Sequence, residues 1–119
     1  MIFEAALANP AVRALLGENP TRFFPFGNAP EDTTKPYALY QLISGVPENY
    51  LDGSPDLDGL TYQVDVYGRT IAEVEQIARA LRAALEAIGH VIRLGANQRG
   101  TETSLYRKTF DLAVFEPPS

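Results

Sequence analysis

The sequence predicts an α+β domain: a mainly antiparallel sheet of four to five strands, with one long helix at about 70–88 and an N-terminal helical segment packed on it. Three observations predict this class. The 119 residues are 45% hydrophobic and contain no cysteine, which fits one domain with a core of its own. Strand-like patterns recur in several segments, and a single long amphipathic stretch interrupts them. We therefore expect one domain over residues 1–119.

The N-terminal helical segment is expected in two pieces. Residues 2–8 form the first piece. The second begins after Asn9, a favoured N-cap that is followed by a proline at the first helical position, and it ends at Gly17. A short extended run follows at 22–26, where the internal Pro25 confines a strand to a sheet edge or a bulge.

Two strands and a long loop come next. Residues 37–43 are rich in aromatic and aliphatic side chains on both faces, which indicates a central strand. Residues 60–67 alternate apolar and polar side chains, as in a strand with one buried face. Between them, residues 45–59 are rich in Gly, Pro, Asp and Asn and exceed the length of a usual hairpin loop, so we predict a functional or mobile loop.

The long helix is the best-specified element. Thr70 and Glu73 form a capping box at its start, and Gly89 stands at the position expected for a C-terminal cap. An apolar stripe runs along residues 71–88, which predicts a helix laid across the sheet. The opposite, polar face carries Glu75, Gln76, Arg79, Arg82 and Glu86.

The chain ends in two predicted antiparallel strands, at 90–94 and 104–116. They are joined across a polar, glycine-bearing hairpin tip at 95–103.

Charge and composition exclude several functions. The net charge of −5 lacks the basic footprint of a phosphate-binding protein. The absence of cysteine removes thiol nucleophiles, cysteine-based zinc sites and iron–sulfur clusters. No apolar run approaches the ~18 residues of a membrane span, and the N-terminus lacks the basic region of a signal peptide. We expect a soluble protein made inside the cell.

No residue pattern predicts an enzyme. The nucleotide-binding glycine motifs and the nucleophile elbow are absent. Any Ser-His-acid arrangement must use His90, the single histidine, at a predicted helix–strand junction where a cap or a surface filler is the commoner role. No second His or Cys joins it to hold a metal. We expect no catalytic, cofactor-binding or metal site, with a small hydrolase using His90 and a carboxylate as an alternative.

The acidic loop matches a calcium-binding loop in part. From Ser54 to Asp65, oxygen donors stand at the first, third and fifth positions and a glycine at the sixth. The first ligand is Ser rather than Asp, the last is Asp rather than Glu, and the flanks are strand-like. Turn formation at the Asp-Gly pairs explains the loop without a metal.

Charged and aromatic side chains favour an interaction protein. Basic residues gather around the last hairpin and acidic residues on the loops, which suits contact between copies or with a partner, although scattered surface charge explains the pattern equally well. Aromatic side chains outnumber those that a single sheet–helix interface needs. The candidate interface residues are Phe23, Phe24, Tyr50, Asp52, Asp56, Asp58, Tyr67, Asn97, Arg99, Glu102 and Arg107.

Several segments carry a resemblance through their order and spacing. They are ALANPAVRALLG at 6–17, PYALYQ at 36–41, LDG at 51–53, YQVDVYG at 62–68, and a helix with Thr70, Glu73, Ala78, Leu81 and Leu85. Together they cover most of the chain. In this combination the sequence resembles the tail-completion or tail-terminator family of long-tailed bacteriophages and prophages.

The resemblance implies a structural subunit without an active site or cofactor. Six copies would form a ring at the head-proximal end of the tail tube of the virion, after synthesis in the bacterial cytoplasm. The ring would end tube growth and offer a joining surface to head-completion or neck proteins. DNA would pass through its lumen without specific binding, which suits the acidity of the chain. The alternatives are another head–tail connector, such as an adaptor or stopper, and a non-phage α+β binding module.

The same resemblance suggests how subunits join. We expect them to lie side by side and to extend their sheets across the boundary, with the run at 22–26 and the last strand as candidate edges. We expect the loop at 45–59 and the tip at 95–103 to become ordered on contact with the tube or the neck.

Overall fold

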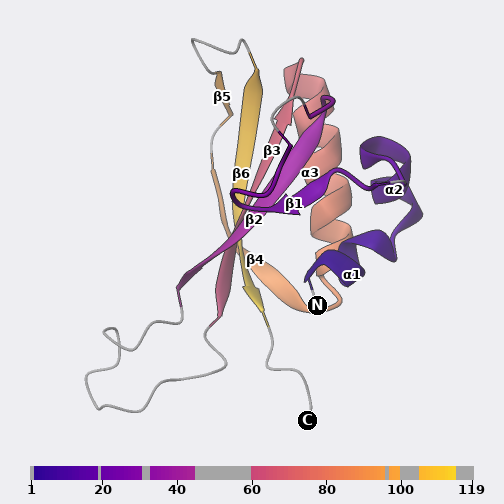
Figure 1. Ribbon diagram of the computed structural model, residues 1–119. Helices are drawn as coiled ribbons and strands as arrows, with labels where there is room; N and C mark the ends of the chain where they lie inside the picture. Colours follow the sequence, from indigo (N-terminus) through magenta and orange to yellow (C-terminus); the bar gives the residue numbers. More distant parts are fainter. Residues whose placement is uncertain are drawn as a thin grey trace, which may run out of the picture.

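The computed structural model describes residues 2–18, 20–30, 33–44, 60–95, 97–99 and 105–114, and in it all the helices lie on one face of a single sheet (Figure 1). The described elements are α1 (Ile2–Leu7), α2 (Pro10–Leu16), β1 (Phe23–Pro25), β2 (Tyr37–Ser44), β3 (Thr61–Gly68), α3 (Ile71–Leu85), β4 (Gly89–Leu94), β5 (Gln98–Arg99) and β6 (Tyr106–Val114).

The strand order is β1-β2-β3-β6-β4, and β5 pairs with β6 at the end that β4 leaves uncovered. Only β1 is parallel to its neighbour among these strands, because it runs in the same direction as β2. This mainly antiparallel sheet with one long helix confirms the predicted α+β class.

The two N-terminal helices form where the sequence predicts them. The side chain of Asn9 accepts a hydrogen bond of 2.8 Å from the backbone N–H of Ala11, which caps α2. At the other end Gly17 has a φ of 89° and donates its N–H to the carbonyl of Arg13. That left-handed conformation favours glycine. Both helices pack against α3, and so the N-terminal segment covers the outer side of the long helix (Figure 1).

The start of α3 is confirmed and its end is corrected. Thr70 Oγ1 accepts the N–H of Glu73 at 3.0 Å, and Glu73 Oε1 accepts the N–H of Arg69 at 2.9 Å. The helix ends at Leu85, however, three residues before the predicted end. Gly89 is therefore not a helix cap but the first residue of β4. A Cβ there would lie 2.1 Å from the carbonyl oxygen of Ala113, so this close approach of β4 to β6 requires glycine.

The core lies between α3 and the helix-facing side of the sheet. From α3 it takes the stripe Val74, Ile77, Ala78, Leu81 and Leu85, all buried. The sheet contributes Ala38 from β2, Val64 and Val66 from β3, and Phe110, Leu112 and Val114 from β6. Burial of each large side chain contributes about 1.5–3 kcal/mol, so this layer holds the helix on the three central strands.

One of the two sheet edges is as predicted and the other is not. The run at 22–26 contains β1, which forms one edge as predicted. The last strand, β6, is not an edge, because β3 pairs with it on one side and β4 and β5 pair with it on the other. The opposite edge is β4. Part of the predicted hairpin tip is also strand, since Gln98 and Arg99 pair with β6. The predicted loop at 45–59 lies outside the described residues.

Candidate functional site

The sheet face opposite the helices is the first candidate surface, because none of the described helices covers it (Figure 1). The strand register places its side chains in rows across the sheet. One row is Tyr37, Tyr67, Arg107 and Gln98, the next is Leu39, Asp65 and Thr109, and the third is Gln41, Gln63, Asp111 and Arg93. The face is therefore apolar toward β2 and polar toward β6.

The carboxylates of this face are held by neighbouring side chains. Asp65 is only 4% exposed, and its Oδ1 accepts a hydrogen bond of 2.6 Å from the hydroxyl of Thr109 and another of 3.1 Å from the amide of Gln63. Asp111 pairs with Arg93 at 2.8 Å, and this hydrogen bond raises the pKa of the Arg93 guanidinium. These internal pairs satisfy the buried charges. Within the described part of the chain, no cluster of three or more His, Asp or Glu side chains could hold a metal ion.

Two tyrosines stack at one end of this face. The rings of Tyr37 and Tyr67 lie 5.1 Å apart between centroids, with an angle of 19° between their planes. Burial, with the neighbouring Tyr67, raises the pKa of Tyr37. Tyr67 is a predicted interface residue, and the stack leaves it half-buried and next to Arg107, another predicted one. Arg107 donates a hydrogen bond to Gln98 of β5.

The other predicted interface residues fall into four groups. Phe23 is 1% exposed and packs in the core, 4.7 Å from the ring of Tyr40, so it adds no surface in the free subunit. Phe24 is half-buried beside β2. Asn97 and Arg99 are exposed next to β6. The remaining candidates, Tyr50, Asp52, Asp56, Asp58 and Glu102, lie outside the described residues.

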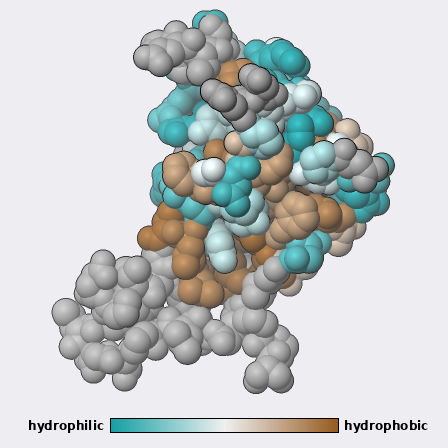
Figure 2. All heavy atoms as spheres, viewed as in Figure 1, coloured by the Kyte–Doolittle hydropathy of each residue, from teal (hydrophilic) through white to brown (hydrophobic). Residues whose placement is uncertain are grey.

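The two edges of the sheet carry apolar side chains that the sequence did not single out. On β4, Ile92 is 58% and Leu94 is 53% exposed. At the opposite edge Phe26, Leu42 and Ile43 are also exposed. Figure 2 shows hydrophobic side chains gathered over the lower part of the sheet, around the end of β2. The apolar residues on both faces of the short strand predicted at 90–94 were the sequence signal that could have identified the exposed apolar side chains of β4.

These edges also have backbone N–H and C=O groups that no described strand pairs with. In the described part of the chain, β4 has β6 on one side and no strand on its other side. β1 pairs only with residues 38–40, so the outer edge of β2 beyond Tyr40 has no strand partner among the described residues. An exposed edge with apolar side chains is a template for pairing with another strand.

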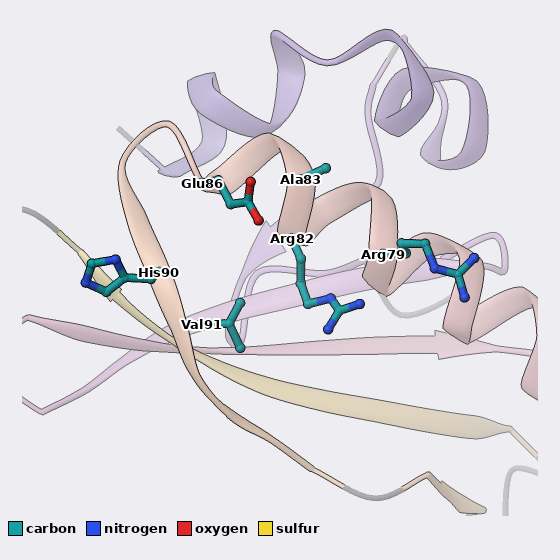
Figure 3. A pocket seen from close by; sticks show the side chains of 6 residues that line it. All are labelled: Arg79, Arg82, Ala83, Glu86, His90 and Val91. Atoms are coloured by element: carbon teal, nitrogen blue, oxygen red, sulfur yellow. The ribbon is translucent and has the colours of Figure 1, made fainter.

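A pocket of about 420 Å³ lies between the second half of α3 and the start of β4 (Figure 3). Its lining residues are Arg79, Arg82, Ala83, Glu86, His90 and Val91. His90, the candidate base of the hydrolase alternative, is one of these residues, and no serine, threonine or tyrosine is among the lining residues that the structure describes. The described lining carries two arginines and one glutamate, and it lies beside the open edge of β4.

Comparisons with known proteins agree with this fold. The sequence model of the family described as "Tail completion protein gp17" matches residues 1–114. A chain in the solved structure titled "Virion of native gene transfer agent (GTA) particle" is similar at a TM-score of 0.52 and 14% identity, over 97% of this chain and 92% of that one. Identity this low supports the fold alone. No curated protein matches the chain. None of the described helices is long and apolar enough to cross a membrane.

Proposed function

The chain belongs to the tail completion protein gp17 family, whose role in the phage tail is structural, and from this premise we propose that it is a tail terminator. Six copies form a ring that caps the head-proximal end of the tail tube in the virion. The ring ends tube polymerisation and offers a joining surface to head or neck proteins. The observation that carries the proposal is the pair of open, apolar strand edges at opposite sides of the sheet.

Strand direction makes these two edges compatible. β1 and β2 run one way, β3 runs the opposite way, β6 runs with β2, and β4 runs against it. Two copies standing side by side in the same orientation therefore bring β4 of one copy next to β1 and β2 of the next in antiparallel order. A head-to-tail contact of this kind uses different surfaces on the two copies, and it closes into a ring when the rotation fits.

We propose that the uncovered sheet face turns inward and the helices turn outward. Helices are about 10 Å thick, and the outer circumference of a ring is longer than the inner one, so the helix layer fits outside. Five strands per copy give about 30 strands in six copies, and a spacing of about 4.8 Å gives a circumference of at least ~144 Å. The backbone diameter is then about 46 Å, and side chains reduce the lumen to roughly 36 Å. Three copies would leave only about 13 Å, too narrow for duplex DNA.

The inward face would not hold DNA by charge. Among the described residues, this face carries two acidic residues, Asp65 and Asp111, and two basic residues, Arg93 and Arg107. Arg93 is already paired with Asp111. A lumen without net positive charge releases few counterions from DNA, so the duplex passes without specific binding.

Contacts with the tube and the neck are assigned to the two ends of the subunit. We propose that Tyr50, Asp52, Asp56 and Asp58 of the loop at 45–59 take part at one end, and Asn97, Arg99 and Glu102 of the tip at 95–103 at the other. Support comes from the sequence, because both segments are polar and rich in glycine. Phe24, Tyr67 and Arg107 are proposed as contacts within the ring.

Two measurements test the proposed function. Native mass spectrometry should give a mass of six subunits, and the purified protein added to polymerising tail-tube protein should produce shorter tubes, each with a ring at one end in negative-stain images. A protein that stays monomeric at high concentration and leaves tube growth unchanged would refute the proposal. A ring that binds a neck protein but not the tube would instead identify an adaptor or stopper.

A further inference from the structure

The short strand β1 forms one edge of the sheet, and alternate residues along it turn their backbone groups toward β2 (Figure 1). The carbonyl of Arg22 accepts the N–H of Ala38 at 2.9 Å, and the N–H of Phe26 donates to the carbonyl of Tyr40 at 2.8 Å. Backbone groups alternate in direction along a strand, so the odd-numbered residues of β1 point to the outside of the sheet.

These outward residues leave β1 without a donor for a further strand. They are Phe23 and Pro25. The N–H of Phe23 donates to the carbonyl of Thr21 at 2.8 Å, and Pro25 has no N–H. Proline on an edge strand is a common way to prevent pairing with another chain. The outer edge of β1 is therefore closed.

The edge of β2 opens where β1 ends. The N–H of Asn28 donates to the carbonyl of Pro25 at 2.9 Å, and Gly27 has a φ of 90°, as in a type II turn. This turn ends β1 after its pairing with Tyr40. Since the carbonyl of Tyr40 points to this edge, both backbone groups of Leu42 point there as well, and no described strand lies beside them.

The free edge of β4 has matching backbone groups. The N–H of Gly95 donates to the carbonyl of Thr109 at 2.7 Å, so the backbone groups of Thr109 and of Asp111 face β4. Arg93 is the partner of Asp111, and its groups point back to β6. Leu94, the next residue, therefore turns its N–H and C=O to the outside of the sheet.

Both open edges also carry a bulge and exposed apolar side chains. On β2 the bulge lies between Leu42 and Ser44, with Ile43 as the extra residue, and Leu42 is 53% and Ile43 is 42% exposed. On β4 the bulge lies between Val91 and Arg93, and the extra residue Ile92 is 58% exposed. Bulges disturb regular pairing, so a strand that joins such an edge must match it.

We infer that β4 of one copy joins the next copy at β2 beyond Tyr40, and that β1 fixes the register of this joint. The inference rests on the proposed ring, in which β4 and β2 of neighbouring copies are antiparallel. Tyr40 and Leu94 stand in one row of the sheet, together with Val64 and Phe110. Copies at the same level would place Leu94 opposite Tyr40, where Phe26 already occupies the edge.

The first open position on the same face of the sheet is Leu42. It lies two residues beyond Tyr40, and a slip of only one residue would turn every side chain of β4 to the opposite face. Leu94 of one copy then lies opposite Leu42 of the next, with the bulge residues Ile92 and Ile43 near them. Each joint is offset by two residues, about 7 Å along the strand, and a stagger of this kind is a condition for closing a sheet into a ring.

Cysteine crosslinking tests the register, because the chain has no cysteine of its own. Within one subunit, positions 42 and 94 lie on opposite edges of the five-strand path, about 19 Å apart, so they cannot bridge. A chain with both Leu42→Cys and Leu94→Cys, oxidised in the ring, should therefore give linked products of up to six subunits. The control pair is Pro25→Cys with Leu94→Cys, which reports pairing with β1 and should stay unlinked.

A second comparison measures the backbone contribution at Leu42. Leu42→Pro removes an N–H that points to the outside, and Leu42→Thr keeps this N–H while it also removes apolar surface. Both free subunits should have melting temperatures close to that of the wild type. The proline variant should need a concentration about tenfold higher than the threonine variant to form rings, because it leaves an acceptor of the neighbouring β4 unsatisfied.

The outcomes separate this inference from the proposed function. A ring that crosslinks through positions 25 and 94, or through neither pair, would overturn the register and leave the ring in place. Equal assembly by Leu42→Pro and Leu42→Thr would also overturn it. Normal rings of Leu42→Pro that no longer cap tubes would assign the β2 edge to a strand of the tube protein. A wild-type protein that forms no ring even with tube protein would refute the proposed function itself.

Discussion

The open edge of β4 gives the sharpest prediction about assembly. Replacing both Ile92 and Leu94 by threonine should weaken the ring without unfolding the subunit. Ile92 is 58% exposed and Leu94 is 53% exposed in the free subunit, so neither is needed to fill its core. Full burial of such a side chain contributes about 1.5–3 kcal/mol, so burying the exposed half in an interface contributes about 0.8–1.5 kcal/mol for each residue. Together they supply about 1.5–3 kcal/mol per contact, which corresponds to roughly 10–150-fold in affinity. Threonine, like the isoleucine at position 92, has the β-branched shape that suits a strand.

Sedimentation velocity over a range of concentrations measures this effect, and thermal denaturation checks that the subunit stays folded. The midpoint of assembly should shift to a concentration at least about tenfold higher, with a melting temperature close to that of the wild type. Ile71→Thr is the control, because Ile71 is 47% exposed but lies at the start of α3, away from β4. Wild-type assembly by the double variant, or an equal loss with Ile71→Thr, would refute the role of the edge.

Two further predictions concern stability. Gly89→Ala should lower the melting temperature by several degrees, because the new Cβ would lie 2.1 Å from the backbone oxygen of Ala113 and must push β4 away from β6. A melting temperature equal to that of the wild type would contradict this close contact. Glu75→Gln should destabilise the subunit at pH 7 more than at pH 3. A hydrogen bond from Asn97, with a smaller contribution from Lys108, lowers the pKa of Glu75 from 4.5, although desolvation opposes this shift. The ionised Glu75 therefore stabilises the folded subunit fully above pH 4.5, and this stabilisation is lost as the pH falls through the lowered pKa. Urea denaturation at the two pH values measures the difference, and an equal loss at both would contradict it.

Local signals predicted the parts of the fold that local interactions determine. The caps at Asn9 and Thr70 and the edge strand with Pro25 all involve groups a few residues apart, and each was correct. The end of α3 was not predicted, because the apolar stripe continues to Ile88 although the helix stops at Leu85. Gly89 looked like a cap for the same reason, and only its approach to Ala113, 24 residues away in the sequence, explains it.

Sheet order and the candidate site depended on contacts that no local pattern encodes. The last strand was placed at an edge, but β4 pairs with β6 and takes that edge instead. Tyr67 and Arg107 were both named as interface candidates from the sequence, and only the strand register places them side by side on β3 and β6. Arg82 was assigned to the solvated face of the helix. Its Nε is buried, and the side chain lies beside Val91 of β4, a tertiary contact that the periodicity of α3 does not reveal.

The acidity of the chain has a different meaning once its location is considered. The net charge of −5 suggested a negative or mixed lumen that does not bind phosphates, and among the described residues the uncovered sheet face carries Asp65 and Asp111 together with Arg93 and Arg107, so these charges balance. Paired ions such as Arg93 and Asp111 produce little field beyond the ~8 Å screening length of physiological salt. In the proposed ring, DNA would therefore slide because the lumen is neutral rather than because it is acidic. Four of the fifteen acidic residues instead fall within residues 45–59, directly after β2 in the sequence, whereas several basic residues belong to the last hairpin. If opposite charges of this kind join neighbouring copies in the proposed ring, high salt should weaken the ring more than it changes the stability of the subunit.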